Sequence, residues 1–231
     1  MSIHKEASFN MFAAQQVKIK GDVMEPTQHV ITRNFKTATD FYTRHMLKHP
    51  FLSEFHSYSE LLYAALLEGD PTVISYVPQP FHLQIGKRHY KPDVYVLREK
   101  QRRQVIELKP RGEMDETLRV PLFHYFKKHR IDFEVLSNEA VMERRTEAEN
   151  WLEIIQILVE ARHLTTTKEE QQVWERLFKN QGCTLREIVD SGNREGTYSL
   201  EVALFRLLHQ GHVVAELSEK SLDYDTVFQC A

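Results

Sequence analysis

The sequence contains only two cysteines among its 231 residues, and it has no long apolar run. Cys183 and Cys230 match neither a metal-ligand spacing nor a disulfide framework, which favours a reducing compartment. No stretch approaches the roughly 18 apolar residues that span a bilayer, and the first residues lack the apolar core of a signal peptide. We therefore expect a cytoplasmic protein with no membrane partner.

An excess of charge of one sign is also lacking, but the charges are unevenly distributed along the chain. The formal net charge is -3 at pH 7, which by itself favours neither a nucleic acid nor a protein as partner. Residues 87–111 carry nine Lys and Arg against three acids, whereas residues 167–231 carry eleven Asp and Glu against seven Lys and Arg. The first stretch suits contact with phosphates, and the second is a poor candidate for the main DNA contact.

The composition is that of a globular protein, with 42% apolar and 27% charged residues, and it leaves little room for long disordered tracts. A chain of this length can form one large domain or two small ones. The polar run from Thr165 to Thr167 favours a boundary. We expect a first domain over residues 1–166, which begins with an irregular lead-in, and a second domain over residues 167–231.

Apolar periodicity predicts alternating helices and strands in the first domain. Helices are expected at residues 37–47, after a capping box from Ser57 to Glu60, and at residues 118–129 and 147–163. Strands are expected at residues 73–77, 81–85, 94–97, 104–108 and 131–136, of which the first four should form one sheet. The helix that crosses to the last strand indicates a βαβ element, and therefore an α/β fold with a mixed sheet.

The second domain shows a different pattern of three short helices and one strand. The helices are expected at residues 169–180, 184–190 and 199–209, and the second begins with a capping box from Thr184 to Glu187. A strand is expected at residues 212–217. Three helices followed by a β-ribbon are typical of a winged helix, so we expect a small helical, winged-helix-like domain.

Asp93 and the segment from Glu107 to Lys109 carry the chemistry that the pattern predicts. Positions 107 and 109 are two apart on a strand, so their side chains project from one face, and a hairpin partner can present Asp93 beside them. Two carboxylates and an ammonium group would then converge. Such a group suits metal-dependent hydrolysis of phosphodiesters, with Lys109 positioning the attacking water or stabilising the developing charge.

Two further ligands are expected at the same place. Glu60, on the helix before the sheet, can reach the cluster and add a carboxylate, and the backbone carbonyl of Leu108 can add another oxygen. The predicted metal ligands are therefore Glu60, Asp93, Glu107 and the Leu108 carbonyl, with Mg²⁺ or Mn²⁺ as the ion. Two purely structural interpretations stay open: Glu60 could serve only its capping box, and Glu107 and Lys109 could be the solvated charges of an edge strand.

Several short segments occur together in one order, and they carry a resemblance. They are residues 59–71 around Glu60, the pair Gln79-Pro80, residues 88–93 around Asp93, and residues 105–110 around Glu107 and Lys109. The set resembles the TnsA endonuclease subunit of heteromeric cut-and-paste transposons, which belongs to the PD-(D/E)xK nucleases. The likeness is best over residues 55–155, and it extends to Asn150-Trp151-Leu152.

The resemblance implies a restriction-endonuclease-like mixed sheet flanked by helices, followed by a helical domain. It implies a transposase subunit that cleaves the 5′ ends of a transposon, while a TnsB-type transposase cuts and joins the 3′ ends. By matching position, Glu60, Asp93 and Glu107 would serve the metal and Lys109 the nucleophilic water. A TnsC-type ATPase regulator would bind mainly through the C-terminal domain, and the protein would associate with the nucleoid when on DNA.

Neighbouring residues provide candidates for contacts with double-stranded DNA at the transposon ends. Arg88, Lys91 and Arg111 are the expected phosphate contacts, although a solvated basic face is the equal alternative. Gln79 and Tyr90 are expected to support the catalytic side chains. Two other functions stay open at this point: a stand-alone restriction or repair endonuclease of the same fold, and a DNA-binding scaffold without catalysis.

Overall fold

The computed structural model describes residues 16–29 and 41–231, and it divides the chain into two compact units. Of the described residues, the first unit contains 16–29, 41–44, 51–61 and 72–143, and the second contains 45–50, 62–71 and 144–231. Residue 166, the expected domain boundary, lies inside the second unit. The expected division of function between residues 1–166 and 167–231 stays a prediction.

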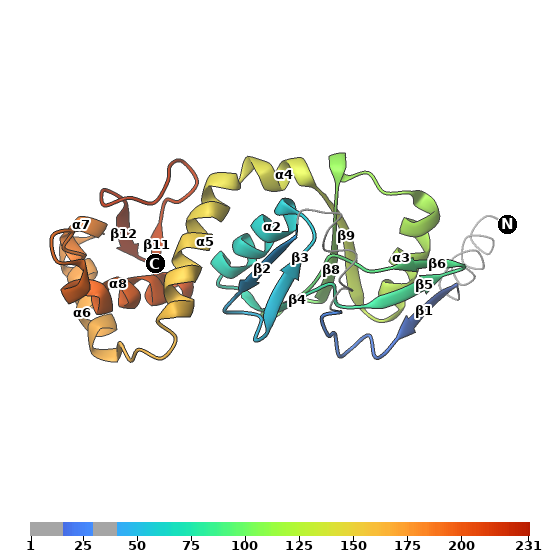
Figure 1. Cartoon of the computed structure of the whole chain (residues 1–231), viewed down its shortest axis with the longest axis horizontal. Coiled ribbons are helices and arrows are strands. Elements are labelled where there is room, and N and C mark those ends of the chain that lie inside the picture. Colours follow the sequence, from blue (N-terminus) through green and yellow to red (C-terminus); the bar gives the residue numbers. More distant parts are fainter. Residues whose placement is uncertain (1–15, 30–40) are drawn as a thin grey trace. The chain divides into compact units, whose positions relative to one another are not determined.

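The largest sheet of the first unit has four strands in the order β4-β7-β8-β9 (Figure 1). Its strands are β4 (Val73–Pro78), β7 (Val94–Arg98), β8 (Arg103–Lys109) and β9 (Ile131–Ser137). The first three are antiparallel, whereas β8 and β9 are parallel and are joined through η1 (Pro110–Gly112) and α3 (Glu116–Lys128). The predicted βαβ element and mixed α/β sheet are therefore confirmed.

A second sheet corrects one prediction. The segment at residues 81–85 forms β5 (His82–Ile85), which pairs with β1 (Val17–Lys20) and β6 (Arg88–Tyr90) in the order β1-β5-β6 and not with the four-stranded sheet. The cause is a partner from the lead-in: β1 supplies hydrogen bonds to one edge of β5, and the short hairpin to β6 supplies those of the other. The alternation of residues 81–85 predicts a strand but cannot choose its partners.

The helix expected at residues 37–47 is also wrong where the structure describes it. Residues 37–40 lie outside the described residues, and the following residues form β2 (Tyr42–His45), which pairs with β3 (Leu52–Phe55). Pro50 limits any helix here to a few turns. Pairing with β3 satisfies the backbone of this short segment and overrides its weak helical periodicity.

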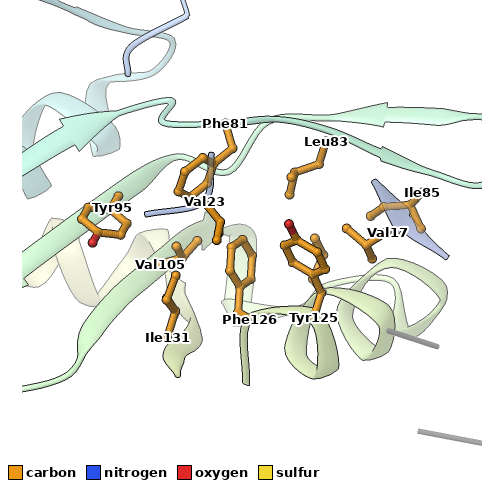
Figure 2. Packing of buried hydrophobic residues seen from close by; sticks show 11 residues of the cluster. Val17, Val23, Phe81, Leu83, Ile85, Tyr95, Val105, Tyr125, Phe126 and Ile131 are labelled. Atoms are coloured by element: carbon orange, nitrogen blue, oxygen red, sulfur yellow. The ribbon is translucent and has the colours of Figure 1, made fainter. Parts of the chain in front are cut away.

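The core of the first unit lies between α3 and the β1-β5-β6 sheet, with contributions from β7, β8 and β9. Figure 2 shows Tyr125 and Phe126 of α3 pointing toward Leu83 and Phe81. Phe81 and Phe126 have ring centroids 6.0 Å apart, and both side chains are buried. Burial of a large apolar side chain contributes roughly 1.5–3 kcal/mol, so this layer fixes one face of the small sheet toward the core.

The second unit contains the expected helices and ribbon in the expected order. Its elements are α5 (Arg145–Glu160), α6 (Thr167–Asn180), β10 (Cys183–Thr184), α7 (Leu185–Ile188), α8 (Arg194–His209), β11 (Val213–Ala215) and β12 (Val227–Cys230). The three strands form an antiparallel sheet in the order β10-β12-β11. A short helix, α4 (Asn138–Glu143), precedes α5 and belongs to the first unit.

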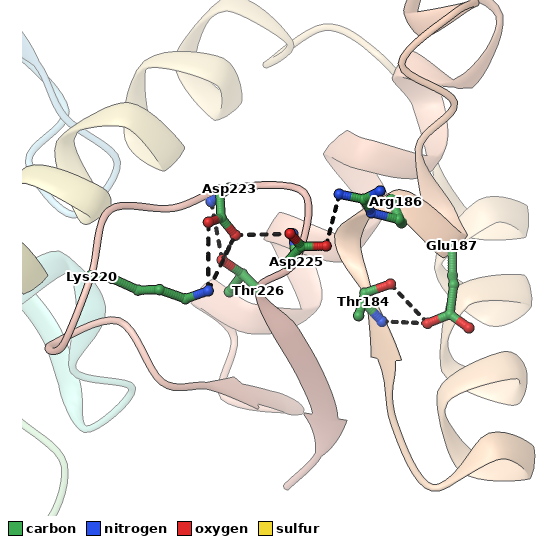
Figure 3. Close-up of polar contacts among 7 residues, drawn as sticks. All are labelled: Thr184, Arg186, Glu187, Lys220, Asp223, Asp225 and Thr226. Atoms are coloured by element: carbon green, nitrogen blue, oxygen red, sulfur yellow. Dashed lines mark hydrogen bonds and ion pairs between the residues drawn. The ribbon is translucent and has the colours of Figure 1, made fainter.

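Polar contacts order the turns of the second unit (Figure 3). The predicted capping box is present, because the Thr184 N–H donates to Glu187 Oε2 over 2.7 Å. Arg186 pairs with Asp225 over 2.7 Å, which ties α7 to the loop before β12. Over the two described ranges, no helix combines the length and the apolar character that crossing a membrane requires.

Candidate active site

The register of β7 and β8 brings Asp93 beside Glu107. Val94 pairs with Ile106 in the antiparallel ladder, so the preceding Asp93 lies opposite Glu107. The Asp93 N–H donates to Glu107 Oε2 over 3.3 Å, and the Leu108 N–H donates to Asp93 Oδ2 over 2.7 Å. In the first unit, Asp93 and Glu107 therefore lie side by side as expected, Glu107 on β8 and Asp93 directly before β7.

Lys109 lies on the same face as Glu107, as the two-residue period of a strand requires. Its ammonium group forms an ion pair with Glu107 Oε1. Only 1% of the Glu107 side chain is exposed, against 33% of the Lys109 side chain. The pair is thus not the solvated edge charge that was the structural alternative, because Glu107 is buried and β8 lies inside the sheet.

Glu60 lies in the first turn of α2 (Tyr58–Gly69) and serves the helix cap. Its backbone N–H donates to Ser57 Oγ over 3.2 Å, and its carboxylate accepts from Ser57 Oγ over 3.1 Å and from the His56 N–H over 3.1 Å. Glu60 therefore takes part in the helix cap, as the structural interpretation predicts. The same carboxylate also accepts a hydrogen bond from outside the cap, from Gln79 Nε2 over 3.2 Å.

Gln79 connects the acid of the helix to the acid of the strand. It follows β4 with a left-handed backbone, at a φ of 44°, and its N–H donates to the Asp93 carbonyl over 2.8 Å. The side chain is buried, and its Oε1 has no hydrogen-bond partner among the described residues. The cluster therefore includes one buried acceptor that the protein itself does not use.

Tyr90 lies at the end of β6, beside the acids. Burial first, and then the neighbouring Glu107 and Asp93, raise the pKa of its hydroxyl. Interaction with this hydroxyl in turn helps to stabilise the charged form of Glu107. Gln79 and Tyr90 thus both lie against the acids that they were expected to support.

The three carboxylates, which we call the carboxylate cluster (Glu60, Asp93 and Glu107), repel one another. Burial raises the pKa of Asp93 well above its usual value, and the charges of Glu107 and Glu60 raise it further. Burial also raises the pKa values of Glu60 and Glu107, against the effect of their hydrogen bonds. The three carboxylates therefore bind protons more readily than isolated acids do, because their surroundings do not fully compensate three negative charges.

The neighbouring carboxylates change the pKa of Lys109 in the direction opposite to burial. Burial alone would lower the pKa of its ammonium group, but Glu107, Asp93 and Glu60 outweigh burial and raise it. Lys109 is therefore a cation at neutral pH. A protonated lysine can donate hydrogen bonds and stabilise negative charge, but it cannot accept a proton.

The fit of a metal ion depends on how the carboxylate oxygens are used. Within the described ranges, no group of three or more His, Cys, Asp or Glu side chains is arranged so that it could hold a metal ion. In this arrangement the oxygens of Glu60 accept from the helix cap and from Gln79, whereas Glu107 Oε1 pairs with Lys109 and Glu107 Oε2 accepts from the Asp93 N–H. The donor chemistry fits Mg²⁺ or Mn²⁺, since crowded carboxylates and the unused Gln79 Oε1 are hard oxygen ligands. The Leu108 carbonyl stays a predicted ligand.

The three expected DNA contacts differ in their surroundings. Arg88 is exposed and pairs with Asp115 Oδ2 over 3.2 Å at the start of α3. Arg111 is exposed in η1, where its N–H donates to Glu139 Oε2 over 2.7 Å. Lys91 is half-buried and lies near His56, whose pKa burial and Lys91 together lower to about 4. Lys91 thus lies near the helix cap that Glu60 completes, and no sequence pattern indicates its neighbour His56.

Comparison with known proteins identifies no relative: no protein-family model matches the chain, and no curated protein sequence matches it.

Proposed function

We propose that this chain is a metal-dependent DNA endonuclease that hydrolyses phosphodiester bonds at the carboxylate cluster and Lys109. The observation that carries the proposal is the meeting of three mutually repelling carboxylates, of which Glu107 is buried and the other two are half-buried, with a lysine, on two adjacent strands and the first turn of a helix. Purely structural acids are seldom arranged in this way, because each buried carboxylate needs its own compensation. Strongly perturbed groups gathered at one place are more often functional.

Glu60, Asp93 and Glu107 would hold the divalent ion once their carboxylates turn away from the hydrogen-bond and ion-pair partners that they have in this arrangement, with the Leu108 carbonyl as a further oxygen. A bound Mg²⁺ or Mn²⁺ lowers the pKa of a coordinated water and steadies charge on a phosphate. Gln79 orients Glu60 through its amide nitrogen, and its free Oε1 is positioned to accept from a water near the cluster. Tyr90, at the end of β6, would favour the charged form of Glu107 and thus lower its pKa.

Lys109 would stabilise negative charge on the reacting phosphate and would not accept the proton of the attacking water. Its raised pKa keeps three N–H donors available, and a donor aimed at the reacting phosphate stabilises the negative charge that develops there. The proton of the attacking water would instead go to a carboxylate of the cluster or to solvent. Removing Lys109 should therefore lower the rate of cleavage more than the binding of DNA.

The finer proposal is that the nuclease is a TnsA-type subunit, with the restriction-endonuclease-like fold and winged-helix-like second domain of that family. It would cleave the 5′ ends of a transposon beside a TnsB-type transposase. The acidic balance of residues 167–231 supports a protein partner for that region, and a TnsC-type ATPase regulator is the partner that the resemblance implies.

A strand-specific cleavage assay tests both levels of the proposal. Wild-type protein and Asp93→Ala are incubated in Mg²⁺ or Mn²⁺ with supercoiled plasmid, and with a plasmid that carries transposon ends together with the cognate TnsB-type transposase. We expect metal-dependent 5′ cleavage by the wild type only when the transposase is present. Asp93→Ala should lose 5′ cleavage and leave 3′ joining intact.

Two outcomes separate the alternatives. Cleavage of naked plasmid by the wild type alone would identify a stand-alone nuclease. Unchanged 5′ cleavage by Asp93→Ala would reject the carboxylate cluster as the active site. The matched control is Asp132→Ala, which removes an exposed carboxylate of β9 in the same sheet, and it should cleave like the wild type.

A further inference from the structure

The small sheet β1-β5-β6 has two faces of opposite character. The register pairs Val17 with Ile85 and Ile19 with Leu83, and these side chains face the core. The alternate positions therefore face outward, since side chains alternate along a strand. These outward positions carry Lys18 and Lys20 on β1, His82 and Gln84 on β5, and His89 on β6. We call Lys18, Lys20, His82 and His89 the basic face.

The groups of the basic face lie close enough to affect one another. The His82 and His89 rings have centroids 5.5 Å apart, and the His29 and His82 rings have centroids 6.0 Å apart. Burial first, and then Lys91, His89 and Lys20, lower the pKa of His82. Burial and the same lysines, together with His82, lower the pKa of His29. The imidazoles thus experience a positive potential.

Few acids oppose this potential in the described part of the chain. None of the described acids forms an ion pair with Lys18, Lys20 or Lys91, whereas Arg88 at the edge of the sheet is held by Asp115. Uncompensated positive charge on an exposed surface costs stability through self-repulsion. Such a surface is suited to a polyanion, whose binding would release counterions and relieve the repulsion.

The basic face leads toward the carboxylate cluster through Lys91 and His29. The His29 N–H donates to the Gln79 carbonyl over 3.2 Å, and Gln79 in turn holds Glu60. Lys91 lowers the pKa values of both His82 and His56, so it lies between the basic face and the helix cap that Glu60 completes. Positive groups therefore extend from β1 to the edge of the cluster without leaving the first unit.

We infer that the basic face is the surface that holds the DNA backbone, so that Lys18, Lys20 and His82 contact the phosphates that flank the one at the carboxylate cluster. The inference rests on the proposed function for its partner, double-stranded DNA. Lysine and histidine supply charge and hydrogen-bond donors to phosphate oxygens, and contacts to phosphates carry no sequence information directly. The face would thus position the duplex without selecting its sequence.

Binding measured without cleavage tests the inference. Anisotropy of a labelled duplex of about 30 base pairs is followed in EDTA, at KCl concentrations from about 50 to 200 mM. The test variant is Lys18→Glu/Lys20→Glu, which reverses two exposed charges of β1. The matched control is Lys127→Glu/Lys128→Glu, which makes the same change in net charge on exposed positions of α3, the helix that packs on the opposite, core side of the sheet.

We expect the β1 variant to bind the duplex at least about tenfold more weakly than the wild type, with a salt dependence smaller by about two counterions. The α3 variant should retain the slope and stay near the wild-type affinity. The neutral variant Lys20→Gln/His82→Asn should lose affinity in the same direction, and its melting temperature shows whether the sheet is still folded. Equal losses in the β1 and α3 variants would overturn the inference.

The inference and the proposed function can fail separately. A β1 variant that binds like the wild type, in a protein that cleaves DNA, would reject the basic face and leave the active site untouched. Affinity that depends on the basic face in a protein that never cleaves would reject the nuclease and retain the surface. Tighter binding of single-stranded DNA or RNA than of the duplex would overturn the duplex as the partner.

Discussion

Gln79 donates a hydrogen bond from Nε2 to Glu60 Oε2 over 3.2 Å, and in doing so joins the helix acid to the sheet. Its backbone N–H donates to the Asp93 carbonyl over 2.8 Å, so a single residue contacts both acids. A carboxylate that accepts from Nε2 identifies that atom as the amide nitrogen. The unpartnered atom is therefore the oxygen, an acceptor enclosed beside three carboxylates.

Replacement of Gln79 by leucine should weaken catalysis without unfolding the protein. Gln79→Leu removes the donor to Glu60 and the free acceptor while keeping the backbone bond to Asp93. Partners that orient metal ligands typically contribute 10–100-fold to metal affinity or activity, so we expect cleavage to fall by about that factor. The concentration of Mg²⁺ that gives half-maximal cleavage should rise.

Gln172→Leu is the control for Gln79→Leu, because Gln172 is an exposed glutamine on α6 of the second unit. It should cleave like the wild type, with the same Mg²⁺ dependence. A purely structural role for Gln79 would lower the melting temperature and the maximal rate without changing the Mg²⁺ concentration at half-maximal rate. That result would reject Gln79 as a positioning residue.

The strand part of the candidate site was predictable from local rules. Asp93, Glu107 and Lys109 needed only the two-residue period of a strand and an antiparallel neighbour, and both features occur in β7 and β8. Glu60 was harder, because its cap spacing explains it fully without any contact to the sheet. The contacts of Gln79 depend on its left-handed backbone after β4, and no sequence pattern around that position predicts this conformation.

The fold was predictable where local and distant interactions agree. The α3 crossover combines a helical period with flanking strands, and its predicted bounds differ from the observed ones by about two residues at most. Two strands show the limit of prediction from local patterns. β5 pairs with β1 as well as with its hairpin partner β6, and β2 pairs with β3, which no sequence pattern predicts. Sheet membership is decided by distant pairing, which periodicity does not contain.

Asp93→Asn should stabilise the protein while abolishing cleavage. The charge of Asp93 is buried and opposed by Glu107 and Glu60, so a neutral amide removes repulsion and can still accept from the Leu108 N–H. We expect a melting temperature higher by about 2–4 °C, the shift that about 1 kcal/mol gives in a protein of this size. Differential scanning fluorimetry in EDTA measures it.

The same melting experiment with Ca²⁺ in place of EDTA tests whether the carboxylate cluster binds a divalent ion. An ion bound by the carboxylate cluster should raise the melting temperature of the wild type, because binding to the folded state alone stabilises by about 2.7 kcal/mol at a hundredfold excess over Kd. Asp93→Asn should show little of this rise, whereas the control Asp132→Asn should behave like the wild type. An equal rise in both variants would place the ion elsewhere.

Lys109 and Glu107 should be coupled in stability but not in catalysis. Lys109→Met leaves Glu107, with 1% of its side chain exposed, without its counter-ion, and an unsatisfied buried group costs about 1–3 kcal/mol. Adding Glu107→Gln removes the stranded charge, so the double variant should recover most of the melting temperature. Neither variant should cleave. Additive losses of stability would show that the ion pair contributes nothing to the fold.

DNA binding should become tighter as the pH falls, through His82. Burial and the charges of Lys91, His89 and Lys20 lower the pKa of His82 below 6.5 in the free protein, and His29 is affected in the same direction. A bound phosphate favours the protonated ring and raises this pKa. Binding therefore takes up protons, and the added affinity is present below the pKa of the bound state and lost as the pH rises through it.

The pH effect is measured as Kd in EDTA from about pH 8 to about pH 5.5, across the range in which histidine titrates. The wild type should gain affinity toward the acid end, and His82→Asn should show a smaller gain. His163→Asn is the control, because His163 is an exposed histidine of the second unit. Identical pH profiles for the wild type and His82→Asn would exclude His82 from the phosphate contacts.

Asn150 should be among the most sensitive positions of the second unit. Its buried side chain donates from Nδ2 to the Leu217 and Lys220 carbonyls over 2.8 Å each, and its Oδ1 accepts from the Leu222 N–H over 2.8 Å. Asn150→Ala leaves three backbone groups of one loop without partners, and one unsatisfied buried group alone costs about 1–3 kcal/mol. We expect a lower melting temperature and faster proteolysis between residues 217 and 222.

Asn150→Asp keeps the acceptor for Leu222 but loses both donors, so its loss of stability should be at least as large. A loop that resists protease in both variants would show that contacts other than those of Asn150 hold it.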